Sequence, residues 1–354
     1  MMMARGLVLI RTDASRRIGS GHVMRCIALA EALAERGHAV RFVCRPLEGD
    51  LRMELRSRGF DVDTLSLIPA DNEASDDEVD AEAMVAVIHT LIGPPTWVVV
   101  DHYGLDARWH RAVAAYGVKI LVIDDLADRP LLCDLLVDQN AIDSIHARYP
   151  ALTPPGCVLL LGPRYTLLRR EFRQALAERI ALCGQSAGPG PILVFLGGAD
   201  ADNLTMQILE RLEGVTLPGP LQVLVGPMNP WRRELQAWCA EHAVSVVIAD
   251  REVSRLLVGA RAAIVACGMF AVELQALEVP SLLLPLSDIQ RTVALRFAEQ
   301  GRAGVLDPVD LARSGALAAA VQSLLALPAE PGGQCAIPLD GASHIVERMH
   351  EIQP

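Results

Sequence analysis

One histidine at the start of a predicted helix is well placed to do chemistry. The apolar run at residues 6–10 and its polar exit lead into Gly19-Ser20-Gly21-His22-Val23-Met24-Arg25. A short apolar run that ends in glycines and passes into a helical period is typical of a buried strand followed by a helix. The apolar positions from Val23 to Ala34 share one helical face, so His22 should point off that face at the helix N-terminus. We interpret His22 as a catalytic histidine; the alternative is a helix-start histidine with a structural hydrogen bond.

Three later turns each combine a strand end, a glycine and the start of a helix. Glycine lets the backbone approach a ligand closely, and the N–H groups and dipole of the following helix favour an anion such as a phosphate. Each turn alone could equally be a tight turn, but three of them on one sheet edge favour a phosphate site. The residues concerned are Gly197 and Gly198 with Asn203, then Gly226, and finally Cys267, Gly268 and Met269 ahead of Glu273.

The elements that must position these residues alternate between apolar runs and helical patterns. This alternation predicts two consecutive α/β units, each with a doubly wound sheet, facing one another across a cleft. Ligands of such sheets bind beyond the carboxyl ends of the strands. The predicted strands are Leu7–Arg11, Ala39–Cys44, Val62–Leu65, Trp97–Asp101, Ile120–Asp124, Leu135–Asp138 and Val158–Leu161, and then Ile192–Leu196, Leu221–Val225, Ser245–Ile248, Ala263–Ala266, Ser281–Leu284 and Ala303–Val305.

The glycine- and proline-rich stretch 184–191 predicts the domain boundary. We expect an N-terminal Rossmann-like domain at 1–165, a linker region at 166–191, a C-terminal Rossmann-like domain at 192–330, and a helical segment at 331–354 that packs back on the first domain. The acidic segment Asp71 to Glu82 is expected to be a solvated loop that leads into a helix ending near Leu91.

Composition restricts the class of protein. A chain of 354 residues with 51% hydrophobic residues can build about two domains with real cores. No apolar run approaches the ~18 residues of a membrane span, and the N-terminus does not resemble a signal peptide, so no membrane insertion is expected. The eight cysteines have no disulfide or metal-ligand spacing, which predicts reduced thiols and a cytoplasmic location. The net charge of −11 disfavours nucleic acid as a partner.

The chain resembles the PseG family of UDP-sugar hydrolases, relatives of MurG-like glycosyltransferases. The resemblance runs nearly end to end and implies a GT-B-like α/β fold of two Rossmann-type domains. It rests on the motifs within Arg11–Arg25, Val100–Asp106, Ile123–Arg129, Asp138–Asn140, Leu161–Tyr165, Gly197–Asp200 with Asn203, and Asp340–Ala342.

The resemblance implies hydrolysis of UDP-2,4-diacetamido-2,4,6-trideoxy-β-L-altropyranose to the free sugar and UDP, in pseudaminic acid biosynthesis and flagellin glycosylation. It implies inversion at the anomeric carbon, with His22 as general base on water. No cofactor or metal is expected, because a diphosphate held by backbone amides and a helix end needs none. UDP is a good leaving group, so the reaction needs less acid help than a glycosidase provides with two carboxylates. It needs a base with a pKa near neutrality, and histidine suits that need.

Other residues of the first half have several interpretations. Asp13 could orient the imidazole, bind substrate or cap the turn. Tyr103, at a predicted strand end, suits contact with the sugar or the catalytic water, and its neighbour His102 is the rival base.

Gly19, Gly21 and Arg25 are expected to bind substrate, although Arg25 could meet only an exposed carboxylate. The paired carboxylates of Asp124 and Asp125 could bind a metal, but a strand-end cap is favoured.

In the second half, the resemblance implies that a UDP-binding domain holds the diphosphate through Gly197, Gly198 and Gly268, while Glu273 binds the ribose hydroxyls and Gln290 lies near the sugar or phosphate. Each could instead be a packing glycine or a solvated side chain. The chain departs from the family at residues 267–270, where relatives have hydroxyl residues, and at Ile289, where they tend to have asparagine. The identity of the sugar nucleotide is therefore open, including its stereoisomer.

Three other functions compete with the hydrolase. A GT-B glycosyltransferase would use the same donor site, although the acidic balance and the lack of an amphipathic basic helix count against it. A nonhydrolysing UDP-sugar 2-epimerase and a sugar-nucleotide-binding homologue without catalysis are the others. Release of UDP, tested with and without His22→Ala, distinguishes them.

Overall fold

The computed structural model describes residues 6–65, 76–142, 144–182, 190–226, 229–248, 253–332 and 337–352. The chain forms two compact units, one made of residues 1–169 and 340–354 and the other of residues 170–339. Within the predicted linker at 166–191, helix α6 (Glu171–Ala181) belongs to the second unit.

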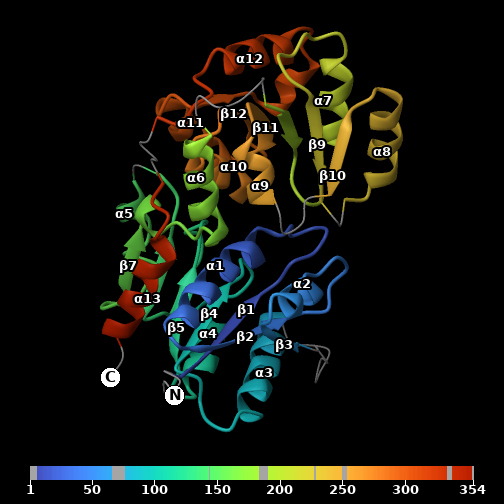
Figure 1. The fold of residues 1–354 in the computed structure, drawn as a ribbon. Coiled ribbons are helices and arrows are strands. Elements are labelled where there is room, and N and C mark those ends of the chain that lie inside the picture. The colour runs from blue at the N-terminus through green and yellow to red at the C-terminus, as the bar shows by residue number, and fades with distance from the viewer. Residues whose placement is uncertain are drawn as a thin grey trace. The chain divides into compact units, whose positions relative to one another are not determined.

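The first unit is built on a seven-stranded parallel sheet with the order β3-β2-β1-β4-β5-β6-β7 (Figure 1). All seven predicted strands are confirmed, each within one residue of its expected bounds. The strands are β1 (Leu7–Thr12), β2 (Ala39–Cys44), β3 (Asp61–Thr64), β4 (Trp97–Asp101), β5 (Lys119–Ile123), β6 (Leu135–Asp138) and β7 (Val158–Leu161).

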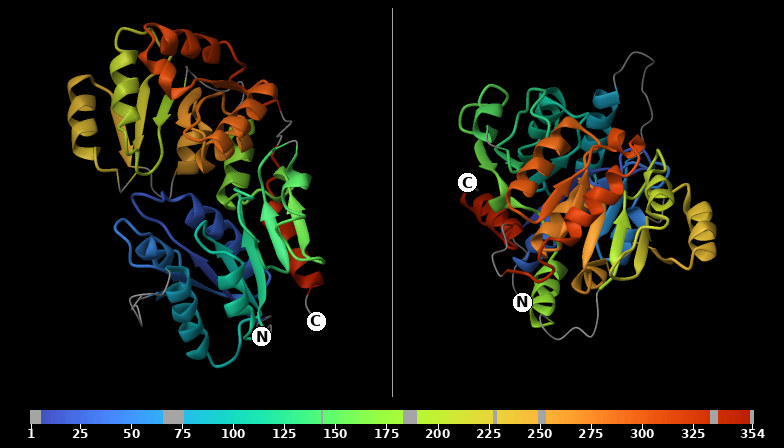
Figure 2. Two further views of the ribbon diagram at one scale, coloured as in Figure 1. Left: turned by 180° about the vertical axis from the view of Figure 1, so that it is seen from behind. Right: turned by 90° about the horizontal axis from the view of Figure 1, so that it is seen from above.

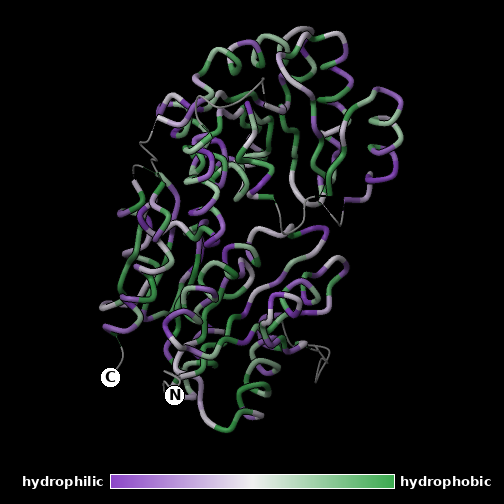
Figure 3. Tube along the Cα trace, viewed as in Figure 1, coloured by the Kyte–Doolittle hydropathy of each residue, from purple (hydrophilic) through white to green (hydrophobic). Residues whose placement is uncertain are grey.

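Helices cover both faces of this sheet (Figure 2). Alternate side chains of a strand point to opposite faces, so Val8 and Ile10 of β1 pack in the core with α1 and α13, whereas Leu9 packs with α3 and α4. Burial on both faces explains the unbroken apolar runs, which form the green centre of the unit in Figure 3. The helices are α1 (Gly21–Glu35), α2 (Arg52–Ser57), α3 (Asp76–His89), α4 (Ala107–Ala114), α5 (Ile145–Arg148), the 3-10 helix η1 (Pro163–Tyr165) and α13 (Gly341–Glu351).

The second unit repeats the design with a six-stranded parallel sheet, ordered β10-β9-β8-β11-β12-β13. The six predicted strands are again confirmed to within one residue. They are β8 (Ile192–Phe195), β9 (Leu221–Val225), β10 (Ser245–Ile248), β11 (Ala262–Ala266), β12 (Ser281–Leu284) and β13 (Ala303–Val305). The helices are α6, α7 (Leu204–Leu212), α8 (Arg232–Glu241), α9 (Val253–Val258), α10 (Met269–Ala276), α11 (Asp288–Glu299), η2 (Pro308–Ala312) and α12 (Ala316–Leu325).

One part of the acidic segment differs from its prediction. Residues 71–75 lie outside the described residues, and α3 begins at Asp76, but Asp80 is fully buried rather than solvated. Its carboxylate accepts hydrogen bonds from Arg11, Arg45 and the Trp109 indole. Burial alone would raise the pKa of Asp80, but Arg11 and Arg45 hold it below its usual value. These donors compensate the burial of the charge.

Within the described residues, none of the helices has the length and apolar character that crossing a membrane requires.

Candidate active site

Strand order places four aspartate-bearing strand ends side by side. The neighbouring parallel strands β1, β4, β5 and β6 end at or just before Asp13, Asp101, Asp125 and Asp138. In doubly wound sheets the ligand lies at the point where the strand order reverses, which here is between β1 and β4. Helix α1 follows β1 and starts at this point, so its first turns bring further side chains to the same edge.

His22 is held by Asp101. The imidazole Nδ1 lies 2.6 Å from Asp101 Oδ1, and the carboxylate is fully buried. Burial alone would raise the pKa of Asp101, but the charge of Arg25 and the bond to His22 keep that pKa well below its ordinary value. Because an ionised carboxylate only accepts, Nδ1 is the donor, and Nε2 is left as the basic atom.

Arg25 joins two carboxylates. One helical turn after His22, its guanidinium donates to both oxygens of Asp101 at 2.6 and 2.7 Å and to Asp125 Oδ2 at 2.6 Å. The side chain is buried. The carboxylates that Arg25 meets are therefore buried rather than exposed, and its expected contact with a substrate oxygen stays a prediction.

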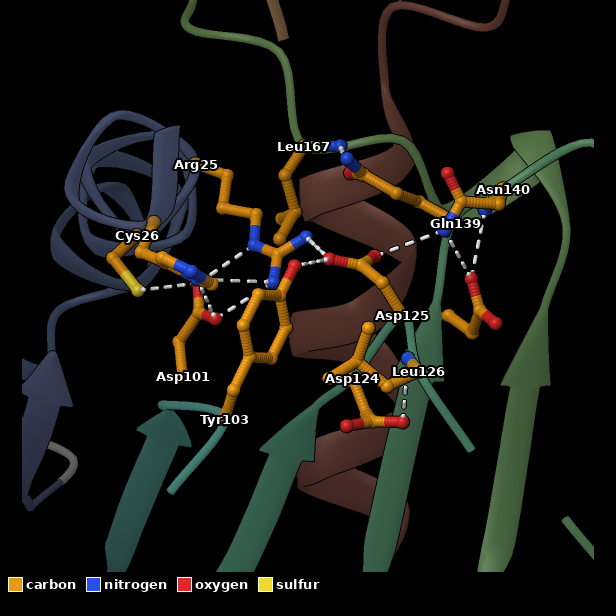
Figure 4. A network of polar contacts seen from close by, with 12 residues as sticks. Arg25, Cys26, Asp101, Tyr103, Asp124, Asp125, Leu126, Gln139, Asn140 and Leu167 are labelled. Atoms are coloured by element: carbon orange, nitrogen blue, oxygen red, sulfur yellow. Dashed lines mark hydrogen bonds and ion pairs between the residues drawn. The ribbon is translucent and has the colours of Figure 1, made fainter. Parts of the chain in front are cut away.

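Tyr103 completes the cluster from the loop after β4 (Figure 4). Its hydroxyl donates to Asp125 Oδ2 at 2.7 Å, and its ring packs edge-on against the His22 ring with centroids 4.5 Å apart. The other oxygen of Asp125 accepts from the amide of Asn140 at 2.9 Å. Tyr103 is 40% exposed, so it is the member of this cluster most open to a ligand.

A second layer of polar residues lies behind Asp125. The Asn140 amide also donates to Asp138 at 2.8 Å, and the Tyr149 hydroxyl and Arg148 donate to the other oxygen of Asp138. Burial, with a contribution from the charge of Asp125, raises the pKa of Asp138 to about 6. Sequence analysis assigned no role to these residues, although Asp138 and Asn140 stand in a motif that it quoted.

Asp13 binds Arg11 at 2.8 Å and the Arg45 backbone N–H at 2.7 Å, and its histidine neighbour is His102 at 3.6 Å. The orientation of His22 that was one expectation for Asp13 is provided by Asp101 instead. Burial and the charge of Arg11 lower the pKa of His102 to about 4, which makes it a poor base at neutral pH.

Asp124 is a strand-end cap, as favoured. Its Oδ2 accepts from the backbone N–H groups of Leu126 and Ala127. Over the ranges that the structure describes, no group of three or more His, Cys, Asp or Glu side chains is arranged to hold a metal ion.

Two glycines, Gly19 and Gly21, lie in the turn that leads into α1 and at its first residue. Gly19 adopts a left-handed φ of +83° and closes a small turn through its N–H bond to the Ser15 carbonyl. Gly21 is the first residue of α1, directly before His22. Their expected contact with substrate stays a prediction.

In the second unit, the three glycine turns follow the adjacent strands β9, β8 and β11 and so share one sheet edge, as expected. Gly226 packs directly on Gly198, since a Cβ at 226 would lie 2.4 Å from the Gly198 carbonyl oxygen. At the start of α7, Asn203 is left-handed, and the Asp200 carboxylate accepts from the N–H groups of Leu204 and Thr205. The expectation that these N–H groups face an anion is wrong, because the chain's own carboxylate binds them.

The start of α10 is more exposed than the start of α7. Gly268 is exposed at the N-cap, and a Cβ there would meet nothing within 4 Å. Cys267 is buried, Met269 opens the helix, and Glu273 is buried one turn later. Gln290 lies in the first turn of α11, whose N-cap is Ser287, and its Oε1 accepts from the Leu286 N–H at 2.8 Å.

No protein-family model matches the chain. In sequence it is 27% identical over 246 residues to the UDP-2,4-diacetamido-2,4,6-trideoxy-β-L-altropyranose hydrolase of Campylobacter jejuni, which covers 69% of this chain and 78% of that protein. Its fold is similar to that of MurG from Acinetobacter baumannii, with a TM-score of 0.60 and 15% identity over 98% of this chain and 99% of that one. It is also similar to CalG4, the calicheamicin glycosyltransferase, with a TM-score of 0.55 and 18% identity over 99% and 94%. The resemblance drawn from the motifs is confirmed: the chain is similar in sequence to the Campylobacter hydrolase, and its two parallel sheets have the GT-B architecture of MurG.

Proposed function

We propose that the chain hydrolyses a UDP-sugar, UDP-2,4-diacetamido-2,4,6-trideoxy-β-L-altropyranose or a stereoisomer of it, to the free sugar and UDP. The product would enter pseudaminic acid biosynthesis and the glycosylation of flagellin in the cytoplasm. The observation that carries the proposal is the His22–Asp101 pair at the carboxyl edge of the first sheet, in a chain similar to a named UDP-sugar hydrolase.

In the proposed reaction, His22 Nε2 takes a proton from water as the water oxygen attacks the anomeric carbon. The bond between that carbon and the UDP oxygen breaks, and the configuration inverts. Asp101 stabilises the imidazolium that forms and fixes its tautomer. In the second unit, backbone N–H groups at Gly197, Gly198 and Gly268 would hold the diphosphate, and Glu273 would bind the ribose.

The test is UDP release from the UDP-sugar in water enriched in ¹⁸O. We expect the label in the free sugar and not in UDP, because the carbon–oxygen bond breaks. His22→Ala should lower kcat by about 10²- to 10⁴-fold, the range that general-base catalysis contributes. His102→Ala, the matched histidine control, should have a far smaller effect. Label in UDP, or release that is insensitive to His22→Ala, would contradict the proposal.

A further inference from the structure

We infer that Asp125 is a positioning residue that fixes the direction of the Tyr103 hydroxyl proton, so that the Tyr103 oxygen and His22 Nε2 accept the two hydrogens of one water molecule. The inference rests on the proposed function, and it selects the catalytic water, rather than the sugar, as the partner of Tyr103.

The first step concerns the phenol. A tyrosine hydroxyl has one proton, and in this structure it points at Asp125 Oδ2 over 2.7 Å. Asp125 cannot turn away, because Arg25 holds the same oxygen at 2.6 Å and Asn140 holds the other at 2.9 Å. Toward any other group, the Tyr103 oxygen therefore offers only a lone pair.

The proton stays with the phenol. Burial alone would raise the pKa of Asp125, but Arg25 keeps it below its ordinary value, so Asp125 is a carboxylate. Burial, and then the charge of Asp125, raise the pKa of Tyr103 above that of a free phenol. The lowered pKa of Asp125 and the raised pKa of Tyr103 both agree with a hydrogen bond that the Tyr103 hydroxyl donates to Asp125.

The second step concerns the imidazole. Asp101 does for His22 what Asp125 does for Tyr103, since it binds the proton on Nδ1 and leaves Nε2 as an acceptor. Arg25 bonds to both carboxylates and so fixes the Asp101–His22 pair relative to the Asp125–Tyr103 pair. The two rings are in contact, 4.5 Å between centroids. Two acceptors carried by rings in contact suit the two hydrogens of a water, whose lone pair then remains for the anomeric carbon.

The first experiment does not depend on activity. The full chain has four tyrosines, so ¹³Cζ-tyrosine labelling gives few NMR signals, and Tyr103→Phe assigns the one of interest. We expect Asp125→Asn to shift the Tyr103 Cζ signal at neutral pH and to move its titration to lower pH. Asp124→Asn, the neighbouring buried carboxylate that does not touch Tyr103, should leave both unchanged. Should Asp125→Asn not fold, Asp125→Glu is used in its place, since the longer side chain keeps the charge but moves the carboxylate away from its present position against the Tyr103 hydroxyl. An unchanged Tyr103 signal in the variant that folds overturns the inference.

The second experiment is a double-mutant cycle on UDP release. Tyr103→Phe should lower kcat by about 100-fold, with KM little changed, because misplacing a reactant by about 1 Å has an effect of that size. Asp125→Asn should also lower kcat, but adding it to Tyr103→Phe should cause no further loss. Any loss from Asp124→Asn should multiply with that of Tyr103→Phe. Full multiplication for Asp125→Asn would overturn the inference. If the wild type releases no UDP, the proposed function fails, while the NMR experiment still decides whether Asp125 orients Tyr103.

Discussion

Replacing Asp101 by asparagine tests the central pair most directly. The two Asp101 oxygens accept from His22 Nδ1, Arg25 Nη2 and Arg25 Nε. In either orientation, an asparagine amide puts an NH₂ group against one of the Arg25 donors. If the NH₂ group takes the Oδ1 position, it also faces His22 Nδ1, and the imidazole must then carry its proton on Nε2, where it cannot act as a base.

The substitution should lower both the stability of the fold and the rate of UDP release. Removing one partner of a buried ion pair costs about 3–5 kcal/mol of unfolding free energy, and we expect the lower end because Arg25 keeps its bond to Asp125. For activity, an amide in place of the carboxylate of an Asp–His pair lowers kcat by up to about 10⁴-fold, and here by no more than the loss of His22 itself. Urea unfolding and initial rates of UDP release measure the two quantities.

Asp13→Asn is the matched control. Asp13 is also a buried carboxylate at the end of a neighbouring strand and is also bound by an arginine, Arg11. We expect a comparable loss of stability but a much smaller loss of kcat, since Asp13 does not orient His22. The reasoning is refuted if Asp101→Asn retains wild-type kcat, or if Asp13→Asn reduces kcat as strongly.

Three further outcomes follow from the structure. The folded-state pKa of Asp138 is raised to about 6, so the contribution of this carboxyl to stability is complete below about pH 4 and is lost as the pH rises through 6. In urea unfolding, the wild type should lose up to about 3 kcal/mol of unfolding free energy relative to Asp138→Asn between pH 4 and pH 7. A difference between the two proteins that does not change with pH would contradict this. Gly341→Ala would put a Cβ 2.4 Å from the Thr166 carbonyl oxygen and should lower the free energy of unfolding in urea by about 1–3 kcal/mol. The control Gly93→Ala, whose Cβ would meet nothing within 4 Å, should change it by less than about 0.5 kcal/mol. Equal effects of the two substitutions would be evidence against the packing argument. The added methyl of Gly268→Ala would meet nothing within 4 Å and should leave the melting temperature unchanged. If the diphosphate lies against Gly268, calorimetry should show that UDP binds about tenfold or more weakly to this variant. An unaltered Kd would show that Gly268 does not contact the diphosphate.

The strands could be predicted from the sequence because their physics is local. A parallel strand buried on both faces must be apolar at consecutive positions, and polar or glycine residues mark its ends. For this reason the predicted runs at Leu7–Arg11 and Ile192–Leu196 differ from the observed strands by one residue. The burial of Asp80 could not be predicted in this way, since its donors Arg11 and Arg45 come from other strands or loops.

The pairing of His22 with Asp101 shows the same limit at the site. The two residues are 79 positions apart and meet because β4 lies beside β1, with Thr12 paired to Asp101. Apolar runs give the order of strands along the chain but not their order in the sheet, so sequence analysis named the nearer Asp13, and not Asp101, as a residue that could orient the imidazole. The doubly wound strand order, in which the first and fourth strands are neighbours, was the signal that could have identified Asp101.

The fold alone does not choose between water and another acceptor. CalG4, a glycosyltransferase, is similar in fold, so any preference for water has to come from particular side chains. An alcohol that accepts a sugar has one hydroxyl hydrogen to donate, whereas water has two. If Tyr103 and His22 Nε2 are both held as acceptors by Asp125 and Asp101, an alcohol would leave one of them unsatisfied and water would satisfy both. Water therefore satisfies one more acceptor than an alcohol does, so this arrangement would favour hydrolysis over transfer.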